Sequence, residues 1–292
     1  MTGAVWAVIA GFGFGVFQPL NRRVNRELDP YACTFLVLAM GAVLVVGLSL
    51  ATSDLSELGS APISASGWFA LAGVIQFAGG WTMVSLSQRR DGAAKTGAAA
   101  GAMPVISTLL AAVFLAELPT VIAVGGVLLV VVGVMTLSFR HETGIAISQV
   151  PWFGVLAATC WALSPVFVRF GRDGMSDPLL GVGIGFVAAF AVYAVSLAAT
   201  GRWRHLAAVW PRRMSVLMAG LAIAVAIATQ WTSFELIEIA TATSIMQISV
   251  PIVVVTAPLI VGTDFEKITV PLVIGTVLVV GGSLLTVMSR GG

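Results

Sequence analysis

Uncharged polar side chains inside long apolar stretches are the residues of this sequence that could do chemistry. Four of them are glutamines: Gln18, Gln76, Gln230 and Gln247. A carboxamide carries two N–H donors and an acceptor oxygen, and burying it in an apolar medium costs free energy unless partners or water satisfy it. We therefore predict that these glutamines line a wet cavity that binds a polar solute. Hydrogen bonding between packed helices is the alternative.

Other side chains in the same stretches are further candidates for contact with that solute. They are Trp81, Met103, Trp161, Ser164 and Trp231. A tryptophan can also pack between helices or anchor at a membrane surface, and a serine can simply bond one helix to another. Trp161 is the strongest candidate for the cavity, because it lies within a turn of Ser164 and shares a helix face with Pro165.

Two prolines, Pro104 and Pro251, are the last candidates for the site. A proline inside a helix removes the hydrogen bond of the carbonyl one turn upstream, which here belongs to Ala100 or Gln247. In lipid such a carbonyl is costly, whereas in a wet cavity it can bind a ligand. We predict two broken helices whose freed carbonyls face the solute, with a simple packing kink as the alternative.

The elements that must position these residues are membrane-spanning helices. Of the 292 residues, 58% are apolar and 10% are charged, against roughly 25% charged in soluble domains. Apolar stretches of about 20 residues fit helices that cross a bilayer. We predict an all-α integral membrane protein with ten such spans: 4–20, 31–51, 67–88, 93–116, 121–139, 152–170, 179–200, 214–234, 240–262 and 268–288.

The chain contains an internal repeat. Residues 96–117 (TGAAAGAMPVISTLLAAVFLAE) return in degraded form as residues 243–264 (TSIMQISVPIVVVTAPLIVGTD). Three more matches are offset by 148 to 150 residues: Asp29-Pro30 with Asp177-Pro178, Gly80-Trp81-Thr82 with Gln230-Trp231-Thr232, and 130–133 with 278–281. Since each copy holds five spans, the second must enter the membrane from the opposite side. We predict two inverted five-helix repeats, residues 1–143 and 150–290, with the binding site between them.

This arrangement resembles the EamA-type branch of the drug/metabolite transporter superfamily, over nearly the whole chain. The resemblance is carried by Pro104 in the fourth span, Leu115-Ala116-Glu117-Leu118 at its end and Trp161-Ala162-Leu163-Ser164 in the second half. It implies a basket of helices with a central cavity lined from both halves, and transport of small metabolites. Relatives with cavities for aromatic amino acids carry bulky aromatics just before the proline. This chain has residues 101–103, Gly-Ala-Met, there, so that specificity does not follow.

The 15 Lys and Arg residues are unevenly divided between the two sides. Most lie in or beside the loops that follow the odd-numbered spans, and the other side carries only Arg169, Arg172 and Arg290. Short loops rich in Lys and Arg face the cytoplasm. We therefore predict a multi-pass protein of the bacterial plasma (inner) membrane with both termini outside, including a retained first helix rather than a cleaved signal peptide.

The centres of the spans contain no Asp, Glu, Lys, Arg or His. The sequence therefore favours a secondary transporter of small neutral or zwitterionic metabolites, amino-acid-like or amine-like, that works by alternating access and exports its solute. The alternatives are a membrane channel or accessory protein, and an integral-membrane lipid enzyme, which would need clustered acids or histidines. We expect no enzymatic activity, metal, cofactor or nucleic-acid partner. The expected partners are the solute and the bilayer, and a monomer is plausible.

Overall fold

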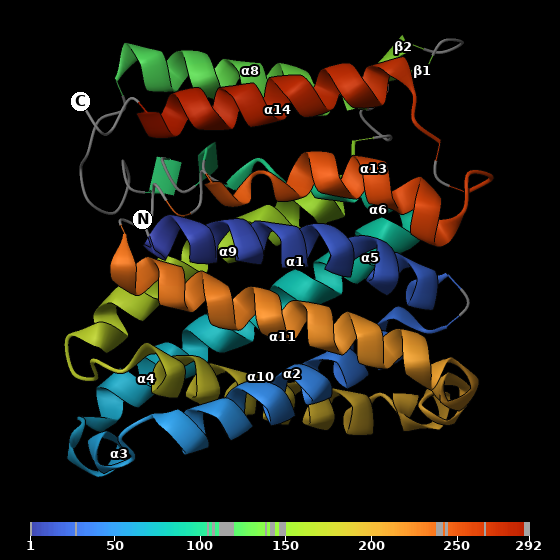
Figure 1. Ribbon diagram of the computed structural model, residues 1–292. Coiled ribbons are helices and arrows are strands. Elements are labelled where there is room, and N and C mark those ends of the chain that lie inside the picture. The colour runs from blue at the N-terminus through green and yellow to red at the C-terminus, as the bar shows by residue number, and fades with distance from the viewer. Residues whose placement is uncertain are drawn as a thin grey trace.

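The computed structural model describes residues 2–26, 28–103, 105–106, 109–110, 120–137, 139–140, 144–145, 150–237, 242, 245–265 and 267–288. These residues form a bundle of helices (Figure 1). Its elements are α1 (Thr2–Asn25), α2 (Pro30–Thr52), α3 (Ser56–Ser60), α4 (Ile63–Gly73), η1 (Val74–Gly80), α5 (Trp81–Asp91), α6 (Ala93–Ala100), α8 (Val121–Leu137), β1 (Phe139–Arg140), β2 (Gly144–Ile145), α9 (Trp152–Arg172), α10 (Pro178–Ala199), η3 (Arg202–His205), η4 (Ala207–Arg212), α11 (Arg213–Leu236), α13 (Ser249–Val261) and α14 (Val270–Met288).

Six helical stretches are long and apolar enough to cross a membrane. They are Thr2–Asn25, Pro30–Thr52, Ile63–Asp91, Trp152–Arg172, Leu179–Ala199 and Arg213–Ser233, and shorter apolar helices cover Val121–Thr136, Ser249–Val261 and Val270–Leu285. Large apolar side chains also lie exposed on the outside of the bundle, such as Leu259 at 78% and Val195 at 69%. Exposed apolar surface on this scale suits lipid rather than water.

Two helices begin in the same way, at the two Asp-Pro sites found in the sequence. Asp29 caps α2 by accepting hydrogen bonds from the backbone N–H groups of Tyr31 and Ala32. Asp177 caps α10 by accepting from the N–H groups of Leu179, at 2.8 Å, and the residue after it. In both helices the proline takes the first position, where its fixed φ fits and no N–H is needed.

The helices alternate in direction, so that α1 begins and α14 ends at the same end of the bundle (Figure 1). α8 and α14 form a pair at the top of the figure, α6 and α13 lie beneath them, and α1, α5 and α9 come next. α11, α2, α4 and α10 complete the bundle below. The most extensive packing joins α1 to α11, α8 to α14, α2 to α10, and α9 to the continuous stretch of α4, η1 and α5.

Close contact between α4 and α10 depends on two glycines. A Cβ placed on Gly73 would lie 2.2 Å from the Cα of Gly185, well inside van der Waals contact. Only two residues without side chains allow the backbones to come this close. The same stretch continues into η1, a π-helical segment of seven residues. π-helical turns are rare and occur often at functional sites.

Two helices are interrupted near the middle of the bundle, as the sequence predicts. α6 ends at Ala100 and a turn follows at residues 101–102. α13 begins at Ser249 after a turn at residues 247–248. The two interruptions lie at equivalent positions of the repeat, about three residues before each proline.

The role expected of the prolines needs correction. Pro251 is the third residue of α13, where a backbone N–H has no partner within the helix, so the proline removes no hydrogen bond there. The carbonyl of Gln247 is not freed, because it accepts a hydrogen bond from the Val250 N–H at 3.0 Å. Pro104 lies outside the described residues.

Candidate functional site

A cavity of about 80 Å³ lies between helices from both halves of the chain. Its walls come from α1, η1, α5, α6, α9, α11 and α13 together with the two interruptions. The lining residues are Phe14, Phe17, Gln18, Gln76, Trp81, Gly97, Ala100, Gly101, Met103, Trp161, Pro165, Ile223, Ile227, Gln230, Met246, Gln247, Ser249 and Val250. At about 10–15 Å³ per water, this volume holds several waters or one small solute.

Most of the residues predicted from the sequence meet in this cavity. Those that line it are Gln18, Gln76, Trp81, Met103, Trp161, Gln230 and Gln247. They come from both halves of the chain, and the four glutamines are all among them. These residues are far apart in sequence, and the packing of the helices brings them together.

Two glutamine oxygens in the cavity wall lack a partner within the described part of the chain. They are the Oε1 atoms of Gln18 and Gln230, whose side chains are 5% and 7% exposed. The amide nitrogen of Gln230 makes only a weak contact, 3.6 Å from the sulfur of Met246. Unpaired buried acceptors of this kind cost about 1–3 kcal/mol each, so a bound N–H or O–H donor would stabilise them.

Gln76 is held in place by Ser164. The Ser164 hydroxyl donates to the Oε1 of Gln76 at 2.7 Å, and the carbonyl of Ala72 lies 3.3 Å from the same hydroxyl. Ser164 itself does not line the cavity, so its predicted contact with solute is replaced by a positioning role. Because the Gln76 oxygen already has a donor, its NH2 group is the part left to act in the cavity.

The two interruptions are joined by hydrogen bonds to one backbone carbonyl. The carbonyl oxygen of Gly101 accepts hydrogen bonds from the amide nitrogen of Gln247 at 3.3 Å and from the hydroxyl of Ser283 at 2.8 Å. Gly101 belongs to the turn after α6, Gln247 to the turn before α13, and Ser283 to α14. The non-helical backbone at this depth is thereby satisfied by side chains of the other half.

Aromatic rings form one wall of the cavity. Trp81 lies against Phe17 and Phe77, with ring centroids 6.1 Å and 5.2 Å apart. Trp161 packs where Gly80 leaves room, since a Cβ on Gly80 would lie 2.6 Å from the indole Nε1 of Trp161. These rings give the cavity apolar faces on which a solute can rest.

Besides Ser164, three of the predicted residues are placed elsewhere or not described. Trp231 lines a different pocket near the end of α11, although it is adjacent to Gln230. Pro251 is exposed and outside the cavity wall, contrary to the prediction. Pro104 lies outside the described residues. The helix turn separates neighbours in sequence by about 100°, so adjacent residues face different spaces.

Sequence reasoning missed part of the cavity wall and a polar cluster beside it. Phe14, Ile223 and Ile227 line the cavity, but an apolar residue in an apolar helix gives no signal. The cluster is centred on Asn21, which is buried and donates to the Oε1 of Gln88 at 2.9 Å. Both residues lie at the ends of predicted spans, and a search that extended past the span limits would have found them.

The cavity carries no ionisable side chain among its described lining residues. Nor do the described residues contain a group of three or more His, Cys, Asp or Glu that could hold a metal ion. What the wall offers is carboxamide oxygens and nitrogens, two backbone turns, a serine hydroxyl and aromatic faces. Such a lining suits reversible binding of an uncharged or zwitterionic solute.

Comparison with solved structures supports this architecture over the full length of the chain. Fifteen solved chains match it. One, described only as "Crystal structure of protein", has a TM-score of 0.64 and 21% sequence identity, and the match covers 98% of each chain. At this identity the match shows a shared fold. No curated protein matches the sequence.

The sequence model of the EamA-like transporter family matches residues 1–139. The predicted resemblance is confirmed over this part of the chain, which includes Gln18, Gln76 and the interruption after α6. Six apolar helices of spanning length agree with a multi-pass membrane protein. Residues 1–139 thus resemble the EamA-like transporter family, a family of membrane transporters within the drug/metabolite transporter superfamily.

Proposed function

We propose that the protein is a secondary transporter of small neutral or zwitterionic metabolites, amino-acid-like or amine-like, which it exports by alternating access. The observation that carries this proposal is the uncharged cavity between the halves, with unpartnered oxygens of Gln18 in one half and Gln230 in the other. These oxygens accept from an amine, amide or hydroxyl of the solute. The NH2 group of Gln76 can donate to a carbonyl or carboxylate oxygen of the same molecule.

We infer ten passes in two inverted repeats, residues 1–143 and 150–290. Support comes from the packing, which is reciprocal under an exchange of the halves. α1 of the first half packs on α11, and the equivalent α9 packs on α4, η1 and α5. α1 also packs on α13, and α9 on α6. The pairs α2–α10 and α8–α14 each join equivalent helices, as expected along a two-fold axis.

Alternating access fits the way in which the halves meet. Each half contributes one interrupted helix to the cavity wall, and Gln247 of one interruption donates a hydrogen bond to the Gly101 carbonyl of the other. A rocking movement of one half against the other would open the cavity to one side at a time. The cavity has room for a small solute.

The proposed location is the bacterial inner membrane, with both termini outside. Most Lys and Arg of the described chain lie at the end of the bundle opposite the start of α1, including Arg23, Arg89 and Arg202. The end that holds the start of α1 carries Arg169 and Arg172. By the positive-inside rule, this asymmetry supports a cytoplasmic position for the first of these ends.

Counterflow in proteoliposomes tests the proposal. A carrier preloaded with unlabelled solute should accelerate uptake of labelled solute from a panel of amino acids and amines, whereas a channel shows no trans-acceleration. Purified protein should also gain thermal stability with the same solutes. A protein that conducts without trans-acceleration would be a channel, and one that converts the solute chemically would be an enzyme. Either result would remove the proposal.

A further inference from the structure

Three carboxamides follow one another along α1, from the central cavity toward the end of the helix. Gln18 lines the cavity, and Asn21 and Asn25 come one and two turns later. Residues three, four and seven apart in a helix lie on one face, which we call the amide face of α1. Asn21 and Asn25 are 2% and 0% exposed and do not line the cavity. The amide face thus continues from the cavity into a part of the bundle where its side chains are buried.

Asn21 connects α1 to α5. Its Nδ2 donates to the Oε1 of Gln88 at 2.9 Å and lies 3.3 Å from the hydroxyl oxygen of Ser85. The hydroxyl of Ser85 is in turn 2.8 Å from that of Thr34 in α2. Bonds of this kind are the usual role of polar side chains between membrane helices.

Other atoms of the same side chains take no part in this bonding. Within the described part of the chain, no partner is found for the Oδ1 and Nδ2 of Asn25, the Oδ1 of Asn21 or the Nε2 of Gln88. Buried polar groups in folded proteins nearly always have a partner. Exchanging the two atoms of the Asn25 carboxamide would change nothing, because both are unpaired. Asn25 therefore does not bond one helix to another in this arrangement.

The four unpaired atoms are two oxygens that accept and two nitrogens that donate. A bare cation or anion would satisfy only one of the two kinds. Water satisfies both, and so does a solute that carries donors and acceptors together. The central cavity presents the same mixture, with the oxygens of Gln18 and Gln230 and the NH2 group of Gln76. The amide face therefore offers the chemistry of the cavity beyond the cavity itself.

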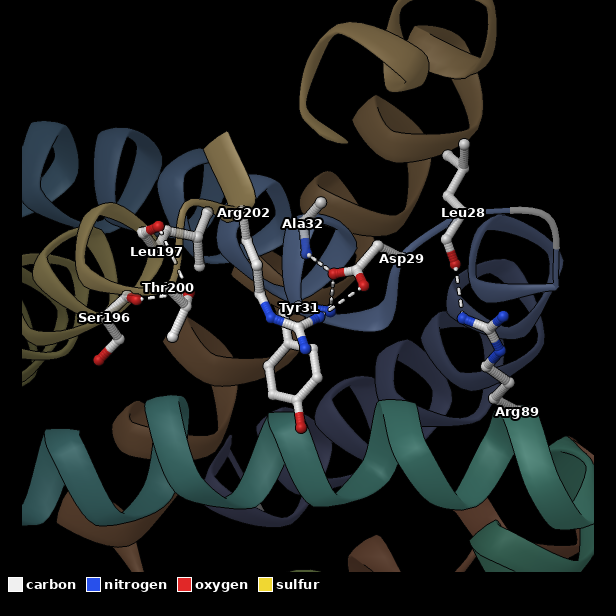
Figure 2. Close-up of polar contacts among 9 residues, drawn as sticks. All are labelled: Leu28, Asp29, Tyr31, Ala32, Arg89, Ser196, Leu197, Thr200 and Arg202. Atoms are coloured by element: carbon white, nitrogen blue, oxygen red, sulfur yellow. Dashed lines mark hydrogen bonds and ion pairs between the residues drawn. The ribbon is translucent and has the colours of Figure 1, made fainter. Parts of the chain in front are cut away.

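Surface contacts hold the chain just beyond Asn25, and Figure 2 shows them. Arg89 of α5 donates from its Nη1 to the carbonyl of Leu28 at 3.3 Å. Arg202 of η3, in the other half, binds the Oδ2 of Asp29 with its Nη1 at 2.8 Å. Such contacts at a surface contribute little to stability, because water competes for both partners. The end of α1 can therefore separate from α5 and η3 at small cost.

The other half of the chain lacks an amide face at the equivalent place. By the offset of 148 residues between the two Asp-Pro sites, Asn21 corresponds to Arg169 and Asn25 to Asp173. Both of these charged residues are exposed, at the end of α9. The repeat therefore does not require buried carboxamides here, and the amide face is a feature of one end of the bundle.

We propose that the amide face of α1 is the part of the solute path between the central cavity and the end of α1. Here α5 packs against α1, and Asn21 and Asn25 are buried and partly unpaired. When the halves rock and α1 separates from α5, water and solute reach these carboxamides. By the charge asymmetry this part of the path is the cytoplasmic one. The inference rests on the proposed transport function and adds the residues that the solute meets before it enters the cavity.

Thiol modification tests whether this face opens. In the full-length protein with Cys33→Ala and Cys160→Ala, a single cysteine replaces Asn25 or, as the control, Val24, which is also 0% exposed but packs with Val209. A membrane-impermeant thiosulfonate is added to vesicles from the side of the loop between α5 and α6. Asn25→Cys should react at least about tenfold faster than Val24→Cys, because modification requires that water and reagent reach the thiol. Equal rates, or modification from the opposite side, would overturn the proposal.

A leucine at position 25 separates a path residue from a structural one. Asn25→Leu removes two unpaired polar atoms from the buried arrangement, so it should raise Tm by roughly 2–4 °C and slow counterflow at least about threefold. Asn21→Leu is the matched comparison and should lower Tm, since it leaves the Oε1 of Gln88 without its donor. A lower Tm or unchanged counterflow in Asn25→Leu would make Asn25 a structural residue and remove the proposal.

The modification assay also separates this inference from the proposed function. It needs no solute, so a wrong substrate class leaves its result unchanged. Absence of counterflow in the wild type would remove the proposed function, whereas equal modification of the two cysteines would remove the path along α1.

Discussion

Single carboxamides set the chemistry of the central cavity. Gln18 and Gln230 were recognisable from the sequence because a polar group in an apolar helix needs a partner, whether that is a solute or another helix. The same signal misplaced Ser164, which holds Gln76 instead of lining the cavity. A polar or aromatic residue type also does not show which pocket its helix face lines. Trp231 therefore lines a different pocket and not the predicted cavity. That information lies in the packing of other helices, which single-residue reasoning does not contain.

Replacing Gln230 by leucine should weaken solute binding by about tenfold. The variant removes an acceptor that the solute would use. Loss of one hydrogen bond typically changes the binding free energy by about 1–2 kcal/mol. Binding is measured by titration with the solute identified in counterflow. Thr136→Val on α8, far from the cavity wall, serves as the control. Equal affinity of Gln230→Leu and the wild type would exclude this oxygen from the site.

The contact of Glu57 with the start of α10 should make stability depend on pH. The hydroxyl of Ser176 and the backbone N–H of Asp177 hold the pKa of Glu57 below its usual 4.5. Because the folded pKa is lowered, these bonds stabilise the fold above the unfolded pKa and are lost as pH falls through the folded value. Glu57→Gln should lower Tm slightly at pH 7 and less at an acidic pH below the folded pKa, where Glu57 is protonated. An equal loss at both values would argue against this contact.

At the scale of elements, the helices themselves were largely predictable. Runs of apolar residues gave the long spans, and Asp-Pro pairs marked the starts of α2 and α10. The interruptions were also expected, but for α13 the reason was wrong, because the Gln247 carbonyl is not freed. The turns precede the prolines, and Pro251 lies in the first turn of α13. Pro19, Pro165 and Pro258 lie inside helices, so a proline alone does not mark a break. The position of a break depends on which carbonyls find other donors.

The approach of α4 to α10 should fail when Gly73 gains a side chain. Gly73→Ala would force the helices apart, because its Cβ would lie 2.2 Å from Gly185 Cα, and overpacking of this kind costs about 1–3 kcal/mol. Gly67→Ala on the same helix is the control, since nothing lies within 4 Å of its added Cβ. It should be neutral or stabilising by up to about 1 kcal/mol. Thermal unfolding in detergent compares the two, and equal Tm values would contradict the contact.

At the scale of the whole molecule, the repeat and the positions of charge predict the orientation. A tag at the C-terminus should react with a membrane-impermeant reagent on intact cells, because the positive loops hold the opposite end of the bundle in the cytoplasm. A tag in the loop between α5 and α6 should be protected. The reverse pattern would invert the orientation while leaving the fold unchanged.

The reciprocal packing of α1 with α11, α9 with α4, and α8 with α14 means that the halves are interleaved. Neither half encloses its own apolar interior, so each supplies the surface that the other must cover. A polypeptide ending at residue 143 should therefore be degraded when produced alone. Synthesised together with residues 150–290 as a separate chain, it should be rescued, and the two pieces should copurify as one transport-competent unit.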